Sequence, residues 1–314
     1  MTANSSLSAL KTNLAKVYFG EPKVVDHLLV ALLCSGHVLL EDVPGLGKTT
    51  LAKALAKSLS LSFKRVQCTP DLMPSDVTGG NIYQPSTQDF KFLPGPIFTH
   101  LLLVDEINRA SPRTQSAFLE AMAEGTVTVD RKTAAVPQPC MGSATQNPVE
   151  FAGTFALPEA QLDRFFMKLQ LGYPNAQAEK ALLQQHLSND GLTALKPVIT
   201  KEALTDLQAQ VQATRVEDTT QQYIISLANL SRQHKAIELG ISPRASIALM
   251  HAARAKACLD GDSFVTPAHV QAIAHPVLSH RLQLRPGSNM TATKALDDLL
   301  LNTPVPNVAS TQGE

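Results

Sequence analysis

The spacing of hydrophobic residues changes about halfway along the 314-residue chain. In the first half, short apolar runs of strand length alternate with segments whose apolar residues recur at the period of a helix. The expected strands lie at residues 37–40, 63–67, 101–105, 141–145 and 165–169. Strands that alternate with helices predict a doubly wound α/β fold with a parallel central sheet.

From about residue 176 onward the strand pattern disappears. The apolar positions then follow helical spacing, as shown by Leu182, Leu183, Leu204, Leu207, Val211, Leu227, Leu230, Ile247, Leu249 and Met250. The sequence therefore predicts three parts: an α/β domain at residues 1–175, a smaller all-α domain at 176–285, and a polar tail at 286–314 that frays.

A glycine-rich turn, DVPGLGKTT at residues 42–50, joins the first expected strand to a helix expected at 49–60. This is the context of a P-loop, or Walker A motif. Gly45 and Gly47 allow the backbone to curl so that its amides point at phosphate oxygens. Lys48 would reach the β- and γ-phosphates, and Thr49 would place its hydroxyl on magnesium. The positive end of the helix dipole adds to the attraction for phosphate.

The expected phosphate-binding residues are Asp42, Pro44, Gly45, Leu46, Gly47, Lys48, Thr49 and Thr50. Asp42 stands where the usual pattern has its first glycine. The alternative interpretation of this segment is a glycine-rich turn ahead of an ordinary helix.

The third apolar run ends in two carboxylates, in the Walker B pattern LLLVDE at residues 101–106. At the end of a buried strand, Asp105 suits a hold on magnesium, and Glu106 is placed to polarise a water for attack on the γ-phosphate. An acidic pair that caps the next helix is the alternative. Together with the P-loop, this pair predicts nucleotide hydrolysis.

Five phrases of the sequence resemble the MoxR family of AAA+ ATPases: LLEDVPGLGKTTLAKAL, PGPIF, LLLVDEINRASPRTQSAFLEAM, SATQNPVE and LPEAQLDRF. The resemblance covers roughly residues 15–285, and Asp42 is itself common in that family's loop. It implies a P-loop AAA+ parallel-sheet ATPase domain followed by an α-helical lid domain, with ATP and Mg²⁺ as cofactors.

The resemblance also implies roles for three later polar residues. Asn147 resembles sensor 1, which contacts the γ-phosphate or the attacking water. Arg164 resembles an arginine finger that reaches the γ-phosphate of the neighbouring subunit, and Arg244 resembles sensor 2, which closes the lid over the nucleotide. The alternatives are a simple Asn-Pro turn at Asn147, local pairing of Arg164 with Asp163 or Glu159, and a surface arginine in a first helical turn for Arg244.

Phe19 and Gly20 resemble the segment that holds adenine, although they could equally form a helix end with a glycine cap. Two insertions fit the same family. Residues 78–96 resemble a loop that interrupts helix 2, and residues 125–137 resemble a hairpin ahead of sensor 1, where the alternation of residues 126–129 and 133–136 also predicts one. Both would project toward the pore of a ring, or they are surface loops without a contact role.

The resemblance implies a homo-oligomer, a hexameric ring, that remodels, assembles or activates partner proteins in a chaperone-like way. The partners implied are proteins with von Willebrand factor A domains. The ATPase subunit of a metal chelatase is one alternative. A nucleic-acid motor is another, disfavoured because 27 basic residues balance 27 acidic ones. His280 and Arg281 are interpreted as structural.

The remaining composition concerns cellular context. The four cysteines form no CxxC pair, so buried free thiols are expected rather than a zinc site or disulfides. The first 20 residues lack the apolar core of a signal peptide, and the apolar runs are shorter than the ~20 residues of a membrane helix. A cytoplasmic protein without membrane insertion is expected.

Overall fold

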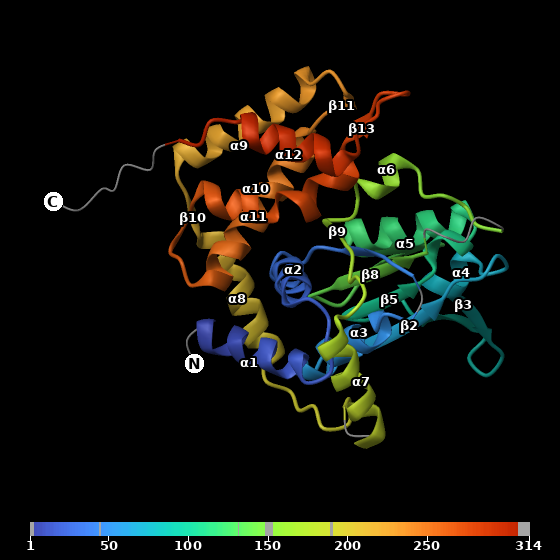
Figure 1. The fold of residues 1–314 in the computed structure, drawn as a ribbon. Helices are drawn as coiled ribbons and strands as arrows, with labels where there is room; N and C mark the ends of the chain where they lie inside the picture. The colour runs from blue at the N-terminus through green and yellow to red at the C-terminus, as the bar shows by residue number, and fades with distance from the viewer. Residues whose placement is uncertain (1–2, 44, 131, 148–152, 189–190, 307–314) are drawn as a thin grey trace.

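The computed structural model describes residues 3–43, 45–130, 132–147, 153–188 and 191–306 (Figure 1). At its centre is a sheet of five strands: β1 (Val38–Glu41), β2 (Phe63–Gln67), β5 (Leu101–Asp105), β8 (Met141–Gln146) and β9 (Met167–Leu169). The strand order is β2-β5-β8-β1-β9, and every neighbouring pair is parallel. The expected parallel sheet is confirmed, and the strand ends agree with the prediction to within two residues.

Helices cover this sheet on both faces. They are α1 (Ala3–Ala15), α2 (Pro22–Leu33), α3 (Lys48–Leu59), α4 (Pro74–Thr78), α5 (Pro112–Glu124) and α6 (Glu159–Leu162), with a 3-10 turn η1 (Ile107–Arg109). On α3, Leu51, Leu55 and Leu59 share a buried face, as their spacing predicts. The α5 helix begins where the Ser111 hydroxyl accepts a hydrogen bond from the Thr114 amide at 3.3 Å, which satisfies one free amide of the first turn.

Two antiparallel hairpins project from this part of the chain. The first pairs β3 (Gly79–Gln84) with β4 (Asp89–Pro94), and the second pairs β6 (Thr126–Val129) with β7 (Lys132–Ala135). The predicted second hairpin is confirmed with a shift of one residue in its second strand. The Asn81 side-chain amide donates to the Asp130 carboxylate at 2.8 Å, so the two hairpins are bonded to each other.

The second half of the chain is mainly helical. It contains α7 (Ala176–Ser188), α8 (Lys201–Ala213), α9 (Asp218–Gln233), α10 (Pro243–Asp260), α11 (Pro267–Leu278), η2 (Ser279–Arg281) and α12 (Ala292–Asn302). Two small ribbons lie between these helices: β10 (Arg215–Val216) with β12 (Phe264–Val265), and β11 (Ile237–Leu239) with β13 (Gln283–Leu284). The prediction that no strands follow residue 176 is therefore wrong in detail. Strands of two or three residues are too short to leave a period-two pattern in the sequence.

The prediction of a fraying tail after residue 286 is wrong for α12. Ala295, Leu296 and Leu299 of this helix are buried, and the Thr291 hydroxyl caps it by accepting from the Lys294 amide at 3.2 Å. These apolar residues follow the i, i+1, i+4 spacing of one helix face. The buried face holds the helix on the lid, while polar neighbours on its other face made the segment look like a tail.

The hydrophobic core does not divide at the boundary expected near residue 175. One buried cluster runs without interruption from α1 and α2 to the helices of the lid, and it includes Leu10, Leu29, Leu207 and Leu249. In Figure 1, α2 lies between the sheet and the lid helices α8 and α10. The lid is therefore packed against the α/β part through a shared apolar layer.

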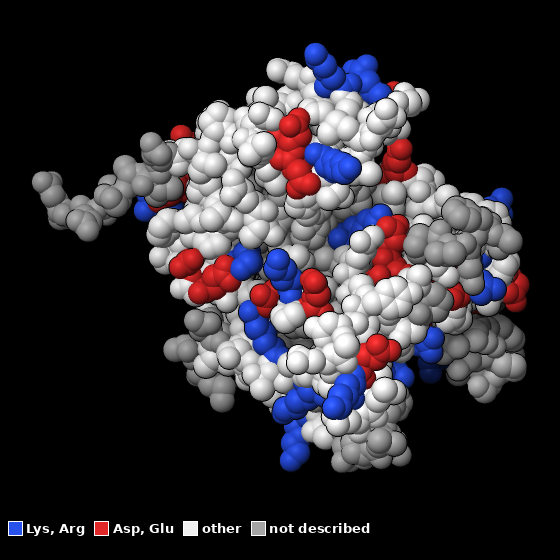
Figure 2. Space-filling view, viewed as in Figure 1, with Lys and Arg blue, Asp and Glu red and all other residues white. Residues whose placement is uncertain are grey.

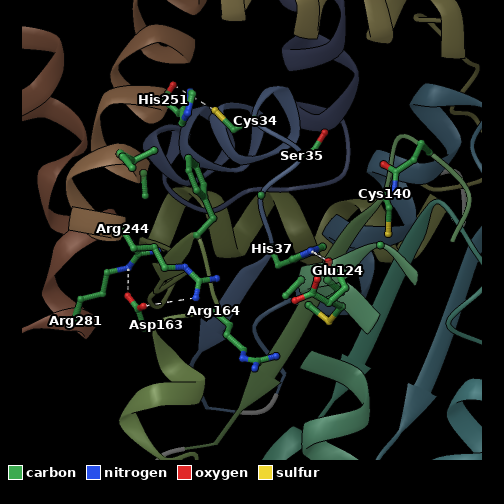
Figure 3. Close-up of a pocket in the computed structure, with 18 residues that line it drawn as sticks. Cys34, Ser35, His37, Glu124, Cys140, Asp163, Arg164, Arg244, His251 and Arg281 are labelled. Atoms are coloured by element: carbon green, nitrogen blue, oxygen red, sulfur yellow. Dashed lines mark hydrogen bonds and ion pairs between the residues drawn. The ribbon is translucent and has the colours of Figure 1, made fainter. Parts of the chain in front are cut away.

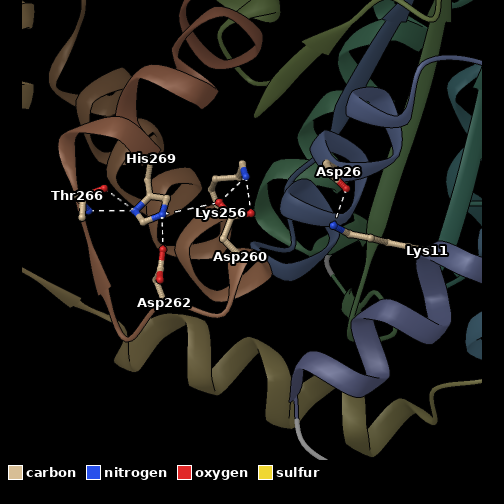
Figure 4. Close-up of polar contacts among 7 residues, drawn as sticks. All are labelled: Lys11, Asp26, Lys256, Asp260, Asp262, Thr266 and His269. Atoms are coloured by element: carbon tan, nitrogen blue, oxygen red, sulfur yellow. Dashed lines mark hydrogen bonds and ion pairs between the residues drawn. The ribbon is translucent and has the colours of Figure 1, made fainter.

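Polar contacts tie the same helices together at the surface (Figure 4). Lys11 of α1 pairs with Asp26 of α2 at 2.8 Å. In the lid, the buried His269 ring lies 3.0 Å from Asp262, so the start of α11 is bonded to the turn that follows α10. On the face shown in Figure 2, basic and acidic side chains of the described residues are interspersed. No helix in the described ranges is long and apolar enough to cross a membrane.

His37 joins three elements at the amino end of the sheet. Its Nε2 donates to the Met122 carbonyl of α5 at 2.6 Å, and its Nδ1 accepts from the Gly142 amide of β8 at 2.9 Å. The ring is almost fully buried, and this burial lowers its pKa below 6.5. The two bonds require one neutral tautomer, because a protonated ring cannot accept from an amide.

We predict that protonation of His37 opposes folding. Above about pH 6.5 the ring is neutral in both the folded and unfolded states, whereas below that pH the unfolded state binds a proton more readily, so the free energy of unfolding falls. The contribution of His37 approaches about 1.4 kcal/mol per pH unit. Urea unfolding of the wild type and a His37→Gln variant between about pH 7.5 and 5.5 measures it. The variant should be less stable at neutral pH but show a shallower pH dependence, and equal slopes would contradict the account.

Candidate nucleotide-binding site

The glycine-rich loop joins the carboxyl end of β1 to the first turn of α3. Gly45 and Gly47 have φ values of 87° and 84°, in the left-handed region that glycine adopts without strain. No atom lies within 4 Å of where a Cβ would stand at either position. The Lys48 ammonium donates to the Asp42 carbonyl at 2.7 Å and so closes the loop on itself. These residues form the curled backbone that a phosphate-binding loop requires.

The rest of the predicted loop surrounds this turn. Leu46 packs against the main apolar cluster, whereas Thr49 and Thr50 lie half-buried in the first turn of α3. Pro44 lies outside the described residues. Thr49 and the free amides of this helix start therefore directly follow the loop.

Asp42 has a structural partner that explains why an acidic residue stands at the place of a glycine. Its buried carboxylate accepts hydrogen bonds from the Leu171 amide and, at 3.4 Å, from the Gly172 amide. Next to it, Glu41 pairs with Lys168 of β9 at 2.6 Å. These contacts fix the beginning of the loop to the segment that follows β9. Sequence reasoning missed them because the pairing of β1 with β9 is not visible in the chain order.

The two predicted acidic residues lie at the carboxyl end of β5. Asp105 is 6% exposed; its Oδ2 accepts from Arg65 Nε at 2.5 Å and its Oδ1 from the Thr145 hydroxyl at 3.3 Å. Glu106 follows with a φ of 56°, an uncommon value for a residue with a side chain, and its amide donates to the Thr145 hydroxyl at 2.8 Å. Thr145 therefore holds the backbone turn that aims Glu106 away from the strand.

Glu106 is engaged by a strand that sequence reasoning left without a role. Its Oε2 accepts from Gln67 Nε2 at 2.8 Å and from Arg109 Nη1 at 3.2 Å. Arg65 and Gln67 lie two residues apart on β2, so both point to one face, and they are bonded to each other at 3.2 Å. The sequence did contain a signal for this contact. Arg65 and Gln67 are long polar residues at alternate positions of a predicted strand, which indicates that both side chains lie on one face.

Asn147 completes the row of polar groups. It follows β8, which lies between β5 and β1 in the sheet, and it is 7% exposed. Since the carboxyl ends of parallel strands meet at one edge, Asn147 lies between the phosphate loop and the acidic pair. Burial lowers the pKa of Lys48, and the carboxylates of Asp42, Asp105 and Glu106 oppose this shift, so all of them act on the same ammonium.

This set of groups fits a nucleotide with magnesium. Carboxylate and hydroxyl oxygens, as in Asp105 and Thr49, are the ligands that Mg²⁺ prefers, usually with only one or two carboxylates beside the phosphates. The amides after Gly45 and the ammonium of Lys48 suit phosphate oxygens.

The segment ahead of α2 lies near the beginning of the loop. Burial, and then the charges of Asp42 and Glu21, raise the pKa of Tyr18 to about 12. Phe19 and Gly20 are half-buried, and a Cβ at Gly20 would meet the Tyr18 hydroxyl oxygen at 2.2 Å. Beside this segment is a cavity of about 400 Å³, which we call the α2–α11 cavity. Its lining includes Glu21, Lys23, His27, Lys168, His275, Ser279 and His280.

The structure brings Arg164 and Arg244 together, but at the other edge of the sheet. Arg164 precedes β9, and Phe166, two residues later, donates its amide to the carbonyl of His37, just before β1. Arg164, Arg244, Arg281 and Asp163 line a second cavity of about 450 Å³, which we call the arginine cavity (Figure 3). The phosphate loop and the acidic pair, in contrast, lie at the carboxyl ends of the strands.

Asp163 forms the ion pairs of this cavity. Its carboxylate lies 3.9 Å from Arg244 Nη1 and 3.5 Å from Arg281 Nε. Within the described part of the chain, Arg164 forms no ion pair with Asp163 or Glu159, so the local pairing considered for Arg164 is not seen.

The fold and the loop define the class of the protein, a P-loop ATPase with a helical lid. Residues 37–167 match the ATPase family associated with various cellular activities (AAA), and residues 229–299 match the AAA lid domain. A crystal structure of a candidate ATPase from Cytophaga hutchinsonii superimposes with a TM-score of 0.90 at 31% identity, covering 97% of this chain and 96% of that one.

Sequence relatives narrow the class to one family. The chain is 49% identical to the uncharacterised protein YeaC of Bacillus subtilis, over 89% of this chain and 88% of YeaC. It is 36% identical to chaperone MoxR1 of Mycobacterium tuberculosis, over 86% and 73% of the two chains, and 32% identical to MoxR of Paracoccus denitrificans, over 86% of each. The protein belongs to the MoxR family of AAA+ ATPases.

Proposed function

We propose that the protein hydrolyses ATP with magnesium in a ring of identical subunits, where each site is completed by the neighbouring copy, and that the cycle drives chaperone-like remodelling of partner complexes. One observation carries this proposal. The groups that suit nucleotide binding lie at the carboxyl edge of the sheet, whereas Arg164 and Arg244 lie together at its amino edge.

The first half of the site comes from one chain. Lys48 and the loop amides hold the phosphates, while Thr49 and Asp105 hold magnesium, which would neutralise charge that develops on the phosphates. Glu106 accepts a proton from, and so orients, the attacking water, and Asn147 contacts the γ-phosphate. Such a site supplies binding and orientation, and its own nearby arginines, Arg65 and Arg109, are paired with Asp105 and Glu106.

The adenine would lie beside the segment ahead of α2. Phe19 and Gly20 offer an aromatic ring and a small residue, and Glu21, which follows them in the chain, lines the α2–α11 cavity. A larger residue at position 20 would have to displace the Tyr18 side chain.

The second half comes from the neighbour. The four residues of β1 alone separate the two edges by about 13 Å at the usual rise of a strand. Arg164 of one subunit therefore meets a nucleotide bound by the next subunit. Arg244 lies beside it, so we assign it to the same neighbouring nucleotide rather than to closure over its own.

A contact between two different edges of the same chain is heterologous and produces a ring when its rotation closes. The family resemblance favours six subunits. Each nucleotide would then lie between two copies, and the arginine charge would be supplied only when the neighbour is in place.

A route for the signal of hydrolysis leaves the site through β2. Gln67 contacts Glu106 at the end of this strand, and α4 begins seven residues later and leads directly into the β3–β4 hairpin. The hairpin exposes Ile82, Tyr83, Phe90 and Leu93, each at least half exposed. A change at Glu106 would therefore move a segment that offers apolar surface to another protein.

These features favour a protein partner. The relative MoxR1 is named a chaperone, and the family resemblance favours partners with von Willebrand factor A domains. The net charge of zero and the mixed charges in Figure 2 give no support to a nucleic-acid motor.

The contact between Gln67 and Glu106 yields a first test. Glu106 must leave Gln67 before it can bind the attacking water, and a hydrogen bond to a charged group contributes about 1.5–3 kcal/mol. We predict that Gln67→Ala raises the ATPase rate measured without partner protein by about 10-fold. Gln210→Ala, an exposed glutamine of the lid, serves as the control and should leave the rate unchanged. A lower rate in the Gln67 variant would show that this contact supports catalysis instead of restraining it.

The shared site yields a second test. ATPase activity per chain should rise with protein concentration, because a separated subunit lacks Arg164 of its neighbour. Arg164→Ala should lower kcat by about 10³-fold or more while nucleotide affinity is retained. Arg215→Ala, an exposed arginine of the lid, should behave as the wild type. Activity that does not depend on concentration and survives the loss of Arg164 would overturn the proposal.

A further inference from the structure

The short segment that carries Arg164 is bonded on both sides by the lid. Arg281, in η2, donates from Nη2 to the Phe165 carbonyl at 2.8 Å, and its Nε lies 3.5 Å from the Asp163 carboxylate. One guanidinium thus contacts the residue before Arg164 and the residue after it. Figure 3 shows the contact with Asp163. The Arg281 side chain is only 4% exposed, so these contacts are shielded from water.

Two further lid residues support the same segment. His280 Nε2 donates to the same Phe165 carbonyl at 3.0 Å. Burial and the neighbouring Arg281 charge lower the pKa of His280 to about 3, so the ring remains neutral. Arg244 adds its longer ion pair to Asp163. All three contacts come from the lid, and none of them involves the Arg164 side chain.

The Arg164 side chain itself stays available. It is half-buried, it lines the arginine cavity, and it forms no ion pair in the part of the chain that the structure describes. The backbone on both sides of Arg164 is therefore fixed, while its guanidinium is in no ion pair in the part of the chain that the structure describes. This arrangement is expected of a group that acts on something outside its own chain.

The η2 turn also borders the other cavity. Ser279 and His280 line the α2–α11 cavity next to the expected adenine position, whereas Arg281 lines the arginine cavity. Consecutive residues of one turn therefore line the two cavities, and the second cavity also holds Arg164. A displacement of this turn would therefore move the lining of both cavities.

We propose that Arg281 is a positioning residue for Arg164: it holds the backbone on both sides of the finger, so that the lid of one subunit sets the place of the cation offered to the neighbour's γ-phosphate. This inference rests on the proposed shared site. It assigns a functional role to a residue that the sequence alone presents as structural.

The test uses mixed assemblies of full-length variants. Arg281→Gln should lower kcat by about 10- to 100-fold, the effect of a misplaced catalytic group, while the affinity for a fluorescent ATP analogue stays within about 2-fold of the wild type. Arg285→Gln is the matched control, since this lid arginine bonds the Ile237 carbonyl within the lid, and it should retain activity.

The Arg281→Gln variant keeps an intact phosphate loop, so a neighbour with a well-held finger should restore it. We therefore mix it in equal amounts with Glu106→Gln, which supplies a normal finger but cannot orient water. Random mixing leaves about a quarter of the interfaces with both parts intact, so the mixture should regain about a quarter of the wild-type rate. Arg164→Ala mixed with Glu106→Gln is run in parallel.

The outcomes separate the two proposals. If the Arg164 mixture regains activity and the Arg281 mixture does not, Arg281 acts within its own subunit and this inference is overturned, while the shared site stands. If neither mixture regains activity, the shared site itself fails. Wild-type kcat in Arg281→Gln, or loss of assembly in sedimentation, would also overturn the positioning role. If Arg281→Gln does not fold, Arg281→Lys replaces it in the mixture, because lysine keeps a cation beside Asp163 but cannot span to Phe165. The same outcomes then apply to the Arg281→Lys mixture.

Discussion

The parallel direction of the five strands is the constraint on which the site depends. It brings the loop after β1, the acidic pair after β5 and Asn147 after β8 to one edge, because adjacent parallel strands end together. The same direction places the residues ahead of β9 at the opposite edge, with Arg164. The two groups cannot meet within one chain without breaking the sheet. Two copies of the chain, each offering a different edge, can bring them together.

The packing of the lid limits which parts can move. Its apolar residues share one cluster with α1 and α2, and Arg281 bonds the segment ahead of β9, so lid and sheet are joined at two places. A large hinge between them within one subunit would expose this apolar layer to water. Smaller displacements of η2, or of β2 with the β3–β4 hairpin, leave the layer intact.

The sequence was most informative where local chemistry decides the structure. The glycine-rich pattern predicted the loop, whose glycines have positive φ, and the apolar runs predicted the five strands. Both patterns are formed by neighbouring residues. The partners of Asp42 on the β9 side and of Glu106 on β2 come from segments 39 to 130 residues away, and no local pattern records them. The position of Arg244 beside Asp163 and Arg164 likewise depends on how the lid packs against the sheet, which no local pattern records. The α12 helix was missed although its apolar stripe is local, because polar neighbours masked it.

In the proposed mechanism each catalytic site is shared between two subunits. The decisive experiment is a cryo-electron microscopy structure of the assembled protein with magnesium and a slowly hydrolysed ATP analogue. We expect Lys48 and Asp105 of one subunit and Arg164 of the next to lie around the same γ-phosphate, with Arg244 on the side of the neighbour. A γ-phosphate enclosed by residues of a single chain, with Arg164 facing solvent, would contradict it.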